Sequence, residues 1–66
     1  MKVVVNGQER EVPAGTTVRA LIERMGLGNQ ACAAEVNLAL VPRREHEART
    51  LQAGDRVELV ALVGGG

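Results

Sequence analysis

Aromatic side chains are missing from this sequence of 66 residues, which contains no Phe, Tyr or Trp. Without them the chain has no rings on which bases or sugars could stack, and aliphatic side chains have to build its core. The sequence also lacks net charge, because eight basic residues balance eight acidic ones. It therefore offers no basic field to a phosphate backbone. The two absences together argue against nucleic acid as a partner.

Cysteine and long hydrophobic runs are scarce as well. The one cysteine, Cys32, cannot form an internal disulfide. No run of about 18 apolar residues could cross a membrane, and no charged segment followed by an apolar one marks a leader. We expect a soluble, cytoplasmic protein without membrane contact. Its length predicts one small domain, which buries only roughly 60% of the surface of its unfolded chain.

The sequence begins with the pattern of a β-hairpin. Two short runs surround Asn6-Gly7, a dipeptide that favours the tight turn between antiparallel strands. In the first run, strand alternation places Val3 and Val5 on one face and Val4 on the other. We expect the face with Val3 and Val5 to belong to the core.

The segment "TTVRALIERMGLG" changes to the periodicity of a helix. Val18, Leu21, Ile22 and Met25 follow the i, i+3, i+4, i+7 spacing of a one-sided helix. One of the two preceding threonines can cap its start, and Gly26 stands where a left-handed residue would end it. The pattern predicts a helix of about ten residues that packs one stripe against a sheet.

Two short strands are predicted in "ACAAEVNLALVP", joined by a bend at Asn37-Leu38. Val36 and Leu40 are the side chains that we expect to point inward. The charged segment "RREHEART" then has room for a short helical turn.

The final run, "RVELVALV", follows a turn at Gly54 and alternates like a strand. Val57 and Leu59 fall on one face, whereas Val60 and Leu62 fall on the other. The first face is predicted to be core.

The order of these elements is ββαββ, which predicts an α+β domain with one helix on one face of a mixed sheet. We expect this domain to span residues 1–63 and a flexible glycine tail to span residues 64–66. A single helix leaves the other sheet face bare, so the apolar residues Val4, Val60 and Leu62 on that face need an explanation. They are either ordinary exposed aliphatic residues or a patch that docks a partner.

Few residues suggest chemistry of their own. His46 lies between two glutamates without a partner at catalytic spacing, and we interpret it as a surface residue without a role. The alternation around Cys32 predicts a buried and therefore unreactive thiol. Arg43, Arg44 and Arg49 belong either to a solvated run of charges or to the rim of a docking surface. No catalytic group and no metal site is predicted.

Several motifs together resemble those of the ubiquitin-like, β-grasp sulfur carriers, most closely the ThiS family of thiamine biosynthesis. The resemblance covers essentially the whole chain, and its most specific parts are "EVN" at 35–37, "VPR" at 41–43, "GDRVELV" at 54–60 and the closing glycines. Two departures stand out: relatives often carry an aromatic residue near the position of His46, and they usually end in two glycines rather than three.

The resemblance implies a carrier rather than an enzyme. An ATP-dependent adenylating enzyme would activate the carboxylate of Gly66, and a cysteine desulfurase or sulfurtransferase would supply the sulfur. The resulting thiocarboxylate would be delivered to thiazole synthase. Gly64 and Gly65 have no Cβ, so they suit a backbone that threads a narrow active site. No bound cofactor is implied, because the partner uses the ATP.

Three alternatives remain. The small subunit of molybdopterin synthase also carries a thiocarboxylate tail, but such chains tend to be longer and richer in aromatic residues. A ubiquitin-like modifier would use the same activated carboxylate to form an amide with a lysine. An interaction or RNA-binding module with an idle tail is disfavoured by the neutral charge and the missing aromatics.

Overall fold

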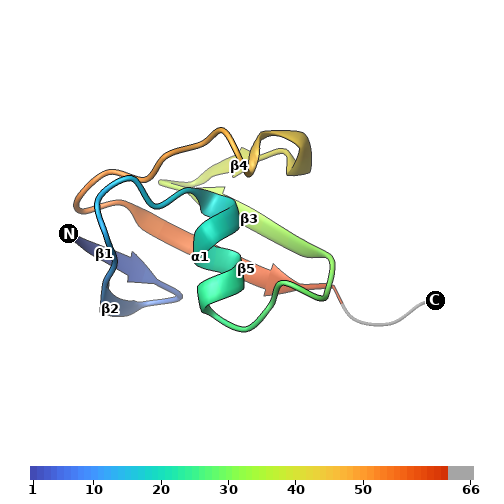
Figure 1. Ribbon diagram of the computed structural model, residues 1–66, viewed down its shortest axis with the longest axis horizontal. Helices are drawn as coiled ribbons and strands as arrows, with labels where there is room; N and C mark the ends of the chain where they lie inside the picture. The colour runs from blue at the N-terminus through green and yellow to red at the C-terminus, as the bar shows by residue number, and fades with distance from the viewer. Residues whose placement is uncertain (63–66) are drawn as a thin grey trace.

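The computed structural model describes residues 1–62, which form five strands, one α-helix and one short 3-10 helix (Figure 1). In chain order the elements are β1 (Lys2–Val5), β2 (Gln8–Glu11), α1 (Val18–Arg24), β3 (Cys32–Val36), β4 (Ala39–Val41), η1 (Arg43–Glu45) and β5 (Arg56–Ala61). No helix among these residues has the length and apolar character needed to cross a membrane.

The five strands make one mixed sheet in the order β2-β1-β5-β3-β4. β5 lies in the middle, parallel to β1 and antiparallel to β3, while both hairpins pair antiparallel. In the first hairpin, Asn6 and Gly7 both adopt positive φ angles, of 49° and 83°. These are the angles that the Asn-Gly pattern predicts, because a type I′ turn requires positive φ at both central residues.

The helix α1 lies across one face of this sheet, as predicted. The Thr17 side chain caps its start by accepting a hydrogen bond from the Ala20 N–H at 3.1 Å. Gly26, with a φ of +79°, follows Met25 at its end. At seven residues the helix is shorter than the ten that the periodicity predicts, because Met25 already leaves helical geometry and only packs against the core.

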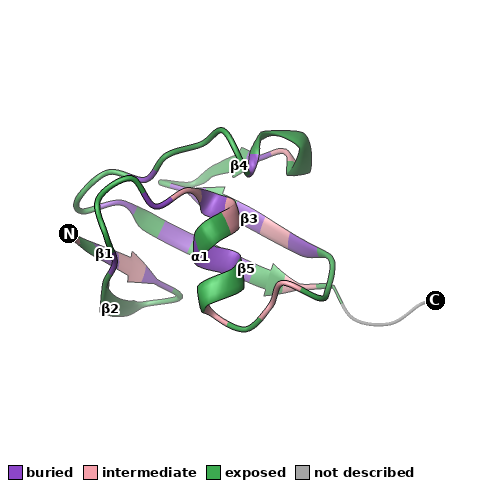
Figure 2. Cartoon of the chain, viewed as in Figure 1, coloured by how far each residue is buried: buried purple, intermediate pink, exposed green. Residues whose placement is uncertain are grey.

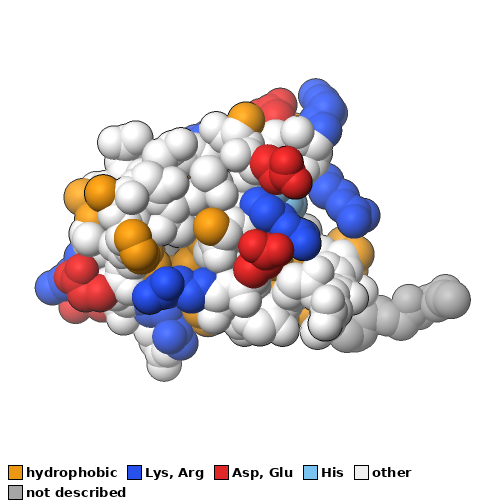
Figure 3. Space-filling view, in the orientation of Figure 1, with side chains coloured by type: hydrophobic (Ala, Val, Ile, Leu, Met, Phe, Trp, Pro, Cys, Tyr) orange, Lys and Arg blue, Asp and Glu red, His pale blue; other side chains and the backbone are white. Residues whose placement is uncertain are grey.

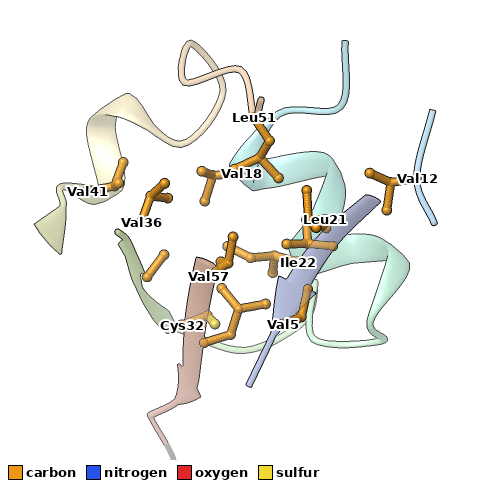
Figure 4. Packing of buried hydrophobic residues seen from close by; sticks show 13 residues of the cluster. Val5, Val12, Val18, Leu21, Ile22, Cys32, Val36, Val41, Leu51 and Val57 are labelled. Carbon is orange, nitrogen blue, oxygen red and sulfur yellow. The ribbon is translucent and has the colours of Figure 1, made fainter. Parts of the chain in front are cut away.

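The core lies between α1 and the inner face of the sheet (Figures 2 and 4). Leu21 and Ile22 point from the helix toward Val5 and Val57 on the two parallel strands. Leu51, from the long segment before β5, covers the same cluster. The predicted inward faces of the first and last strands are confirmed, since Val3, Val5, Val57 and Leu59 are all buried.

The second hairpin corrects one prediction. Leu40, expected to point inward, is 68% exposed, and Val41 is buried in its place. Asn37 and Leu38 form a two-residue turn with positive φ angles, which pairs Val36 with Ala39 and therefore Leu40 with the outward-facing Glu35. A hairpin with a two-residue turn fixes this register, because residues directly opposite each other share a face.

Candidate functional site

The last strand ends beside the beginning of β3. Ala61 lies opposite Cys32 in the ladder, and the Leu62 N–H donates a hydrogen bond to the Ala31 carbonyl at 2.8 Å. Hydrogen bonding to β3 therefore fixes the backbone as far as Leu62. The part of the chain that follows Leu62 therefore begins at a defined position at one end of the sheet.

Two predictions concern residues outside the described part of the chain. The domain boundary after residue 63 is one of them. The roles assigned to Gly64, Gly65 and Gly66 are the other, and both stay predictions.

Apolar side chains gather on the outer face of the sheet near this end. Leu40, Val60 and Leu62 are each more than half exposed, and we call these three residues the outer apolar patch. Val60 lies opposite the small residue Ala33. Ala33, Leu40 and Leu62 line a groove of about 220 Å³. This groove can accept apolar groups of a partner.

Val4 does not belong to this patch, although the sequence suggested that it could. It lies opposite Arg56 at the start of β5, four residues before Val60, and it is partly buried. The structure thus brings Val60 and Leu62 together with Leu40, a residue that the sequence placed in the core. The signal for Leu40 was present in the two-residue turn at Asn37-Leu38.

Charges of opposite sign border the outer apolar patch. On one side Glu35 and Glu58 are direct neighbours on β3 and β5, an arrangement that favours a basic group on a partner. Arg43 lines the groove on the other side, and its exposed position fits the predicted docking rim. The patch therefore has an acidic border and a basic one.

His46 is a correction to the sequence interpretation, because it is buried rather than on the surface. Only 5% of it is exposed, and its Nε2 lies 3.0 Å from the Val41 carbonyl oxygen. A carbonyl can only accept, so Nε2 carries the proton and donates it. The His46 carbonyl in turn accepts from the Arg19 N–H at the start of α1. His46 thus ties the segment after η1 to both β4 and the helix.

Cys32 is buried, as predicted. Burial raises the pKa of the Cys32 thiol above its usual value, because desolvation disfavours the thiolate. The thiolate is the nucleophilic form, so this side chain is poorly suited to carry sulfur itself. Among residues 1–62 no group of three or more His, Cys, Asp or Glu side chains could hold a metal ion.

Comparison with known proteins decides the family. A sequence model described as the ThiS family matches residues 3–66. The chain belongs to the ThiS family. It is 30% identical to the sulfur carrier protein ThiS of Escherichia coli, with each chain covered over its full length. The crystal structure of a thiamine biosynthesis protein, ThiS, from Geobacter metallireducens superposes with a TM-score of 0.82, at 30% identity and full coverage of both chains. The β-grasp fold that the sequence predicts is confirmed.

Two relatives are longer than this chain. A thiazole synthase from Paramagnetospirillum magneticum is 41% identical over all 66 residues, and one from Magnetococcus marinus is 38% identical. The chain spans only 20% of the length of each. Each of these two proteins, named thiazole synthase, therefore contains a segment that is similar to the whole of the present chain.

Proposed function

We propose that this chain is a sulfur carrier of thiamine biosynthesis, and that it carries the sulfur as a thiocarboxylate on Gly66. The observation that carries this proposal is the match to the ThiS family over residues 3–66. The end-to-end similarity to the E. coli sulfur carrier supports it. Cys32 is a poor alternative site for the sulfur, because its thiol is buried and burial raises its pKa. This supports the Gly66 carboxylate as the group that carries the sulfur.

The chemistry requires an external activating enzyme. A carboxylate is a poor acyl donor, so one of its oxygens first attacks the α-phosphorus of ATP and pyrophosphate leaves. A persulfide on a cysteine desulfurase or sulfurtransferase then attacks the acyl adenylate and displaces AMP. Cleavage of the resulting S–S bond by a thiol leaves the thiocarboxylate. In this scheme the chain is a cosubstrate, and the partner binds the ATP.

The described fold supplies a fixed base for such an arm. The ladder between β5 and β3 holds the backbone up to Leu62, and four further residues reach at most about 14 Å when fully extended. Gly65 and Gly66 lack a Cβ, so they can pass through a channel too narrow for other residues. The outer apolar patch lies beside this base and is the surface that we expect a partner to bind.

We further propose thiazole synthase as the acceptor of the sulfur. The two long relatives with that name contain a segment similar to this entire chain. In those relatives the carrier-like segment and the rest of the thiazole synthase belong to one polypeptide. We therefore expect this separate carrier to bind a separate thiazole synthase and to deliver its sulfur in that complex. The thiocarboxylate sulfur would act as the nucleophile that enters the thiazole ring.

The function is tested by exchange of labelled pyrophosphate into ATP, which depends on the carrier only if its carboxylate is adenylated. We expect exchange with the unchanged chain and a sharp loss with Gly65→Val, because the branched side chain obstructs the channel. Ala53→Val is the matched control, since it adds the same side chain at an exposed position before the turn at Gly54. Exchange that does not require the carrier, or that Gly65→Val leaves unchanged, would contradict the proposal.

A further inference from the structure

A second, larger cleft lies between the helix and the segment around η1. It has a volume of about 470 Å³ and is bordered by Arg19 of α1, by Arg43 and Arg44 of η1, and by Glu47. Figure 3 shows basic side chains on either side of the pale blue histidine, at the right of the view. We call this space the arginine cleft. Three arginines and one glutamate are among the residues that line it, although the whole chain has no net charge.

Two of the three arginines, Arg43 and Arg44, have little compensation from carboxylates. Arg44 lies 3.8 Å from Glu45, in a pair whose side chains are both more than half exposed, and such pairs contribute little. No ion pair within 4.0 Å joins Arg43 to a carboxylate of residues 1–62. Only Arg19 has a closer partner, Glu23, at 3.3 Å. Arg19 also donates to the Gly28 carbonyl at 3.5 Å, so its charge is already used within the chain. The charges of Arg43 and Arg44 are therefore the ones available to an outside ligand.

Backbone hydrogen bonds fix the main chain that carries these arginines. The Glu45 N–H donates to the Pro42 carbonyl at 2.8 Å, and the His46 N–H donates to the Arg43 carbonyl at 3.1 Å. The His46 carbonyl joins this turn to Arg19 at the start of α1 through a bond of 2.9 Å. The main chain of two separate elements thus places three arginine residues around one space. The guanidinium group of an arginine suits forked binding of carboxylates.

The arginine cleft adjoins the groove of the outer apolar patch. Cys32, Arg43 and His46 line both spaces, and Leu62, where the described chain ends, lines the groove. A protein that covers the patch and the end of β5 therefore has surface residues next to the arginine cleft. The basic border of the patch continues into the cleft through Arg43.

We propose that the arginine cleft binds an acidic surface segment of thiazole synthase, with Arg43 and Arg44 contacting its carboxylates. This inference rests on the proposed function in taking the synthase as the partner. Charge complementarity favours an acidic occupant, and continuity with the groove at the end of β5 favours the protein that receives the tail. This contact orients the docked carrier and takes no part in the chemistry. The sulfur is transferred from the C-terminal tail.

The first test measures the affinity of separately purified thiazole synthase for the unmodified chain, so that no thiocarboxylate is needed. The double variant Arg43→Glu, Arg44→Glu should bind at least ~10-fold more weakly at low salt, because it sets like charges against the acidic segment. The difference should shrink as salt screens the charges. Arg10→Glu is the matched control, since Arg10 is exposed on β2 at the opposite edge of the sheet, and it should change the affinity less than ~2-fold. Thermal unfolding of each variant checks that the fold is intact.

The second test locates the contact without reversing a charge. The sequence contains one lysine, Lys2 on β1, so Arg43→Lys introduces an amine at the cleft while keeping the charge. A zero-length carbodiimide should couple that amine to an Asp or Glu of the synthase, and mass spectrometry of the linked peptides should identify the residue. Arg10→Lys provides the matched control and should give no such link.

Several results would overturn the inference. One is equal affinity of the double variant and the unchanged chain at low salt. Others are cross-links from position 43 only to a second copy of this chain, or weakened binding of the adenylating enzyme with unchanged binding of the synthase. None of these results affects whether Gly66 becomes a thiocarboxylate, so failure of the docking proposal is distinguishable from failure of the proposed function.

Discussion

The two faces of the central strand β5 differ in what their side chains do. Val57 and Leu59 point inward and are 1% and 6% exposed, whereas Val60 on the other face is 57% exposed. Figure 2 shows the alternation as purple and green bands along the strand. Two valines three residues apart thus serve different purposes, since one is buried under α1 and the other lies on the bare face. Hydrophobicity alone does not distinguish them, but the parity of the strand does.

The comparison extends to the whole sheet. The buried aliphatic side chains of the strands all lie on the inner face, against those of α1, so the residues of this face should determine stability. The outer face combines the outer apolar patch with charged borders, and its residues should determine binding. Substitutions on the two faces should therefore separate the free energy of unfolding from affinity for a partner.

The largest effect is expected for Ile22→Asp. Ile22 is 1% exposed and packs from α1 onto the sheet, so the variant would bury an unpaired carboxylate at a cost of several kcal/mol. Such a cost approaches the total stability of a small domain, which is about 5 kcal/mol. We expect a largely unfolded chain by circular dichroism. Ala20→Asp, on the exposed side of the same helix, is the control and should stay folded until a cooperative thermal transition. Similar thermal unfolding curves for the two variants would mean that the inner face is misassigned.

A smaller loss is expected for His46→Ala. The change removes the donor to the Val41 carbonyl and opens a space beneath η1, and an unsatisfied buried acceptor costs about 1–3 kcal/mol. Urea unfolding should show this decrease. Glu47→Ala, at the exposed neighbouring position, should have little effect. Equal stability of the two variants would show that His46 does not hold the turn in place.

Leu38→Gly is expected to stabilise the chain. Leu38 has a φ of +71° and is 92% exposed, so it adopts a left-handed conformation without gaining burial. Relief of that conformation should raise the free energy of unfolding by about 1 kcal/mol. Leu40→Gly, in the regular part of β4, should lower it instead. A decrease for Leu38→Gly would mean that the exposed leucine stabilises the turn.

The smallest effect on folding is expected for Val60→Arg, which should change stability by less than ~0.5 kcal/mol. Its effect on binding should be clear, because an interface over the outer apolar patch would have to desolvate the new charge. Affinity for thiazole synthase is the measurement. Val4→Arg, outside the patch, is the control. Normal binding by Val60→Arg would mean that the patch is ordinary surface.

Local patterns were sufficient to predict most of the fold. Asn6-Gly7 predicted its turn because few other dipeptides accept positive φ twice. The spacing of Val18, Leu21 and Ile22 predicted the buried side of the helix. Leu40 was misassigned because its face depends on the length of the turn before it, and the two-residue turn reverses the parity that a simple bend suggests.

Other features depend on contacts between distant segments and could not be predicted. His46 has charged neighbours in sequence, yet the short 3-10 helix before it turns its ring toward Val41. The arginine cleft likewise combines Arg19 with Arg43 and Arg44, which lie more than twenty residues further along the chain. The sequence suggested a docking rim at Arg43, Arg44 and Arg49, but nothing local indicates that Arg19 of α1 lies beside them.

The mass of the C-terminal residue tests the central claim most directly. After incubation with the adenylating enzyme, ATP and a persulfide donor, fragmentation of the chain should place the replacement of one oxygen by sulfur on Gly66. Fragmentation is needed because oxidation of Met1, Met25 or Cys32 adds a nearly equal mass to the intact chain. The modification should be absent when ATP is omitted. An unmodified Gly66 carboxylate in the complete reaction, with an enzyme that adenylates another ThiS-family carrier, would contradict the account.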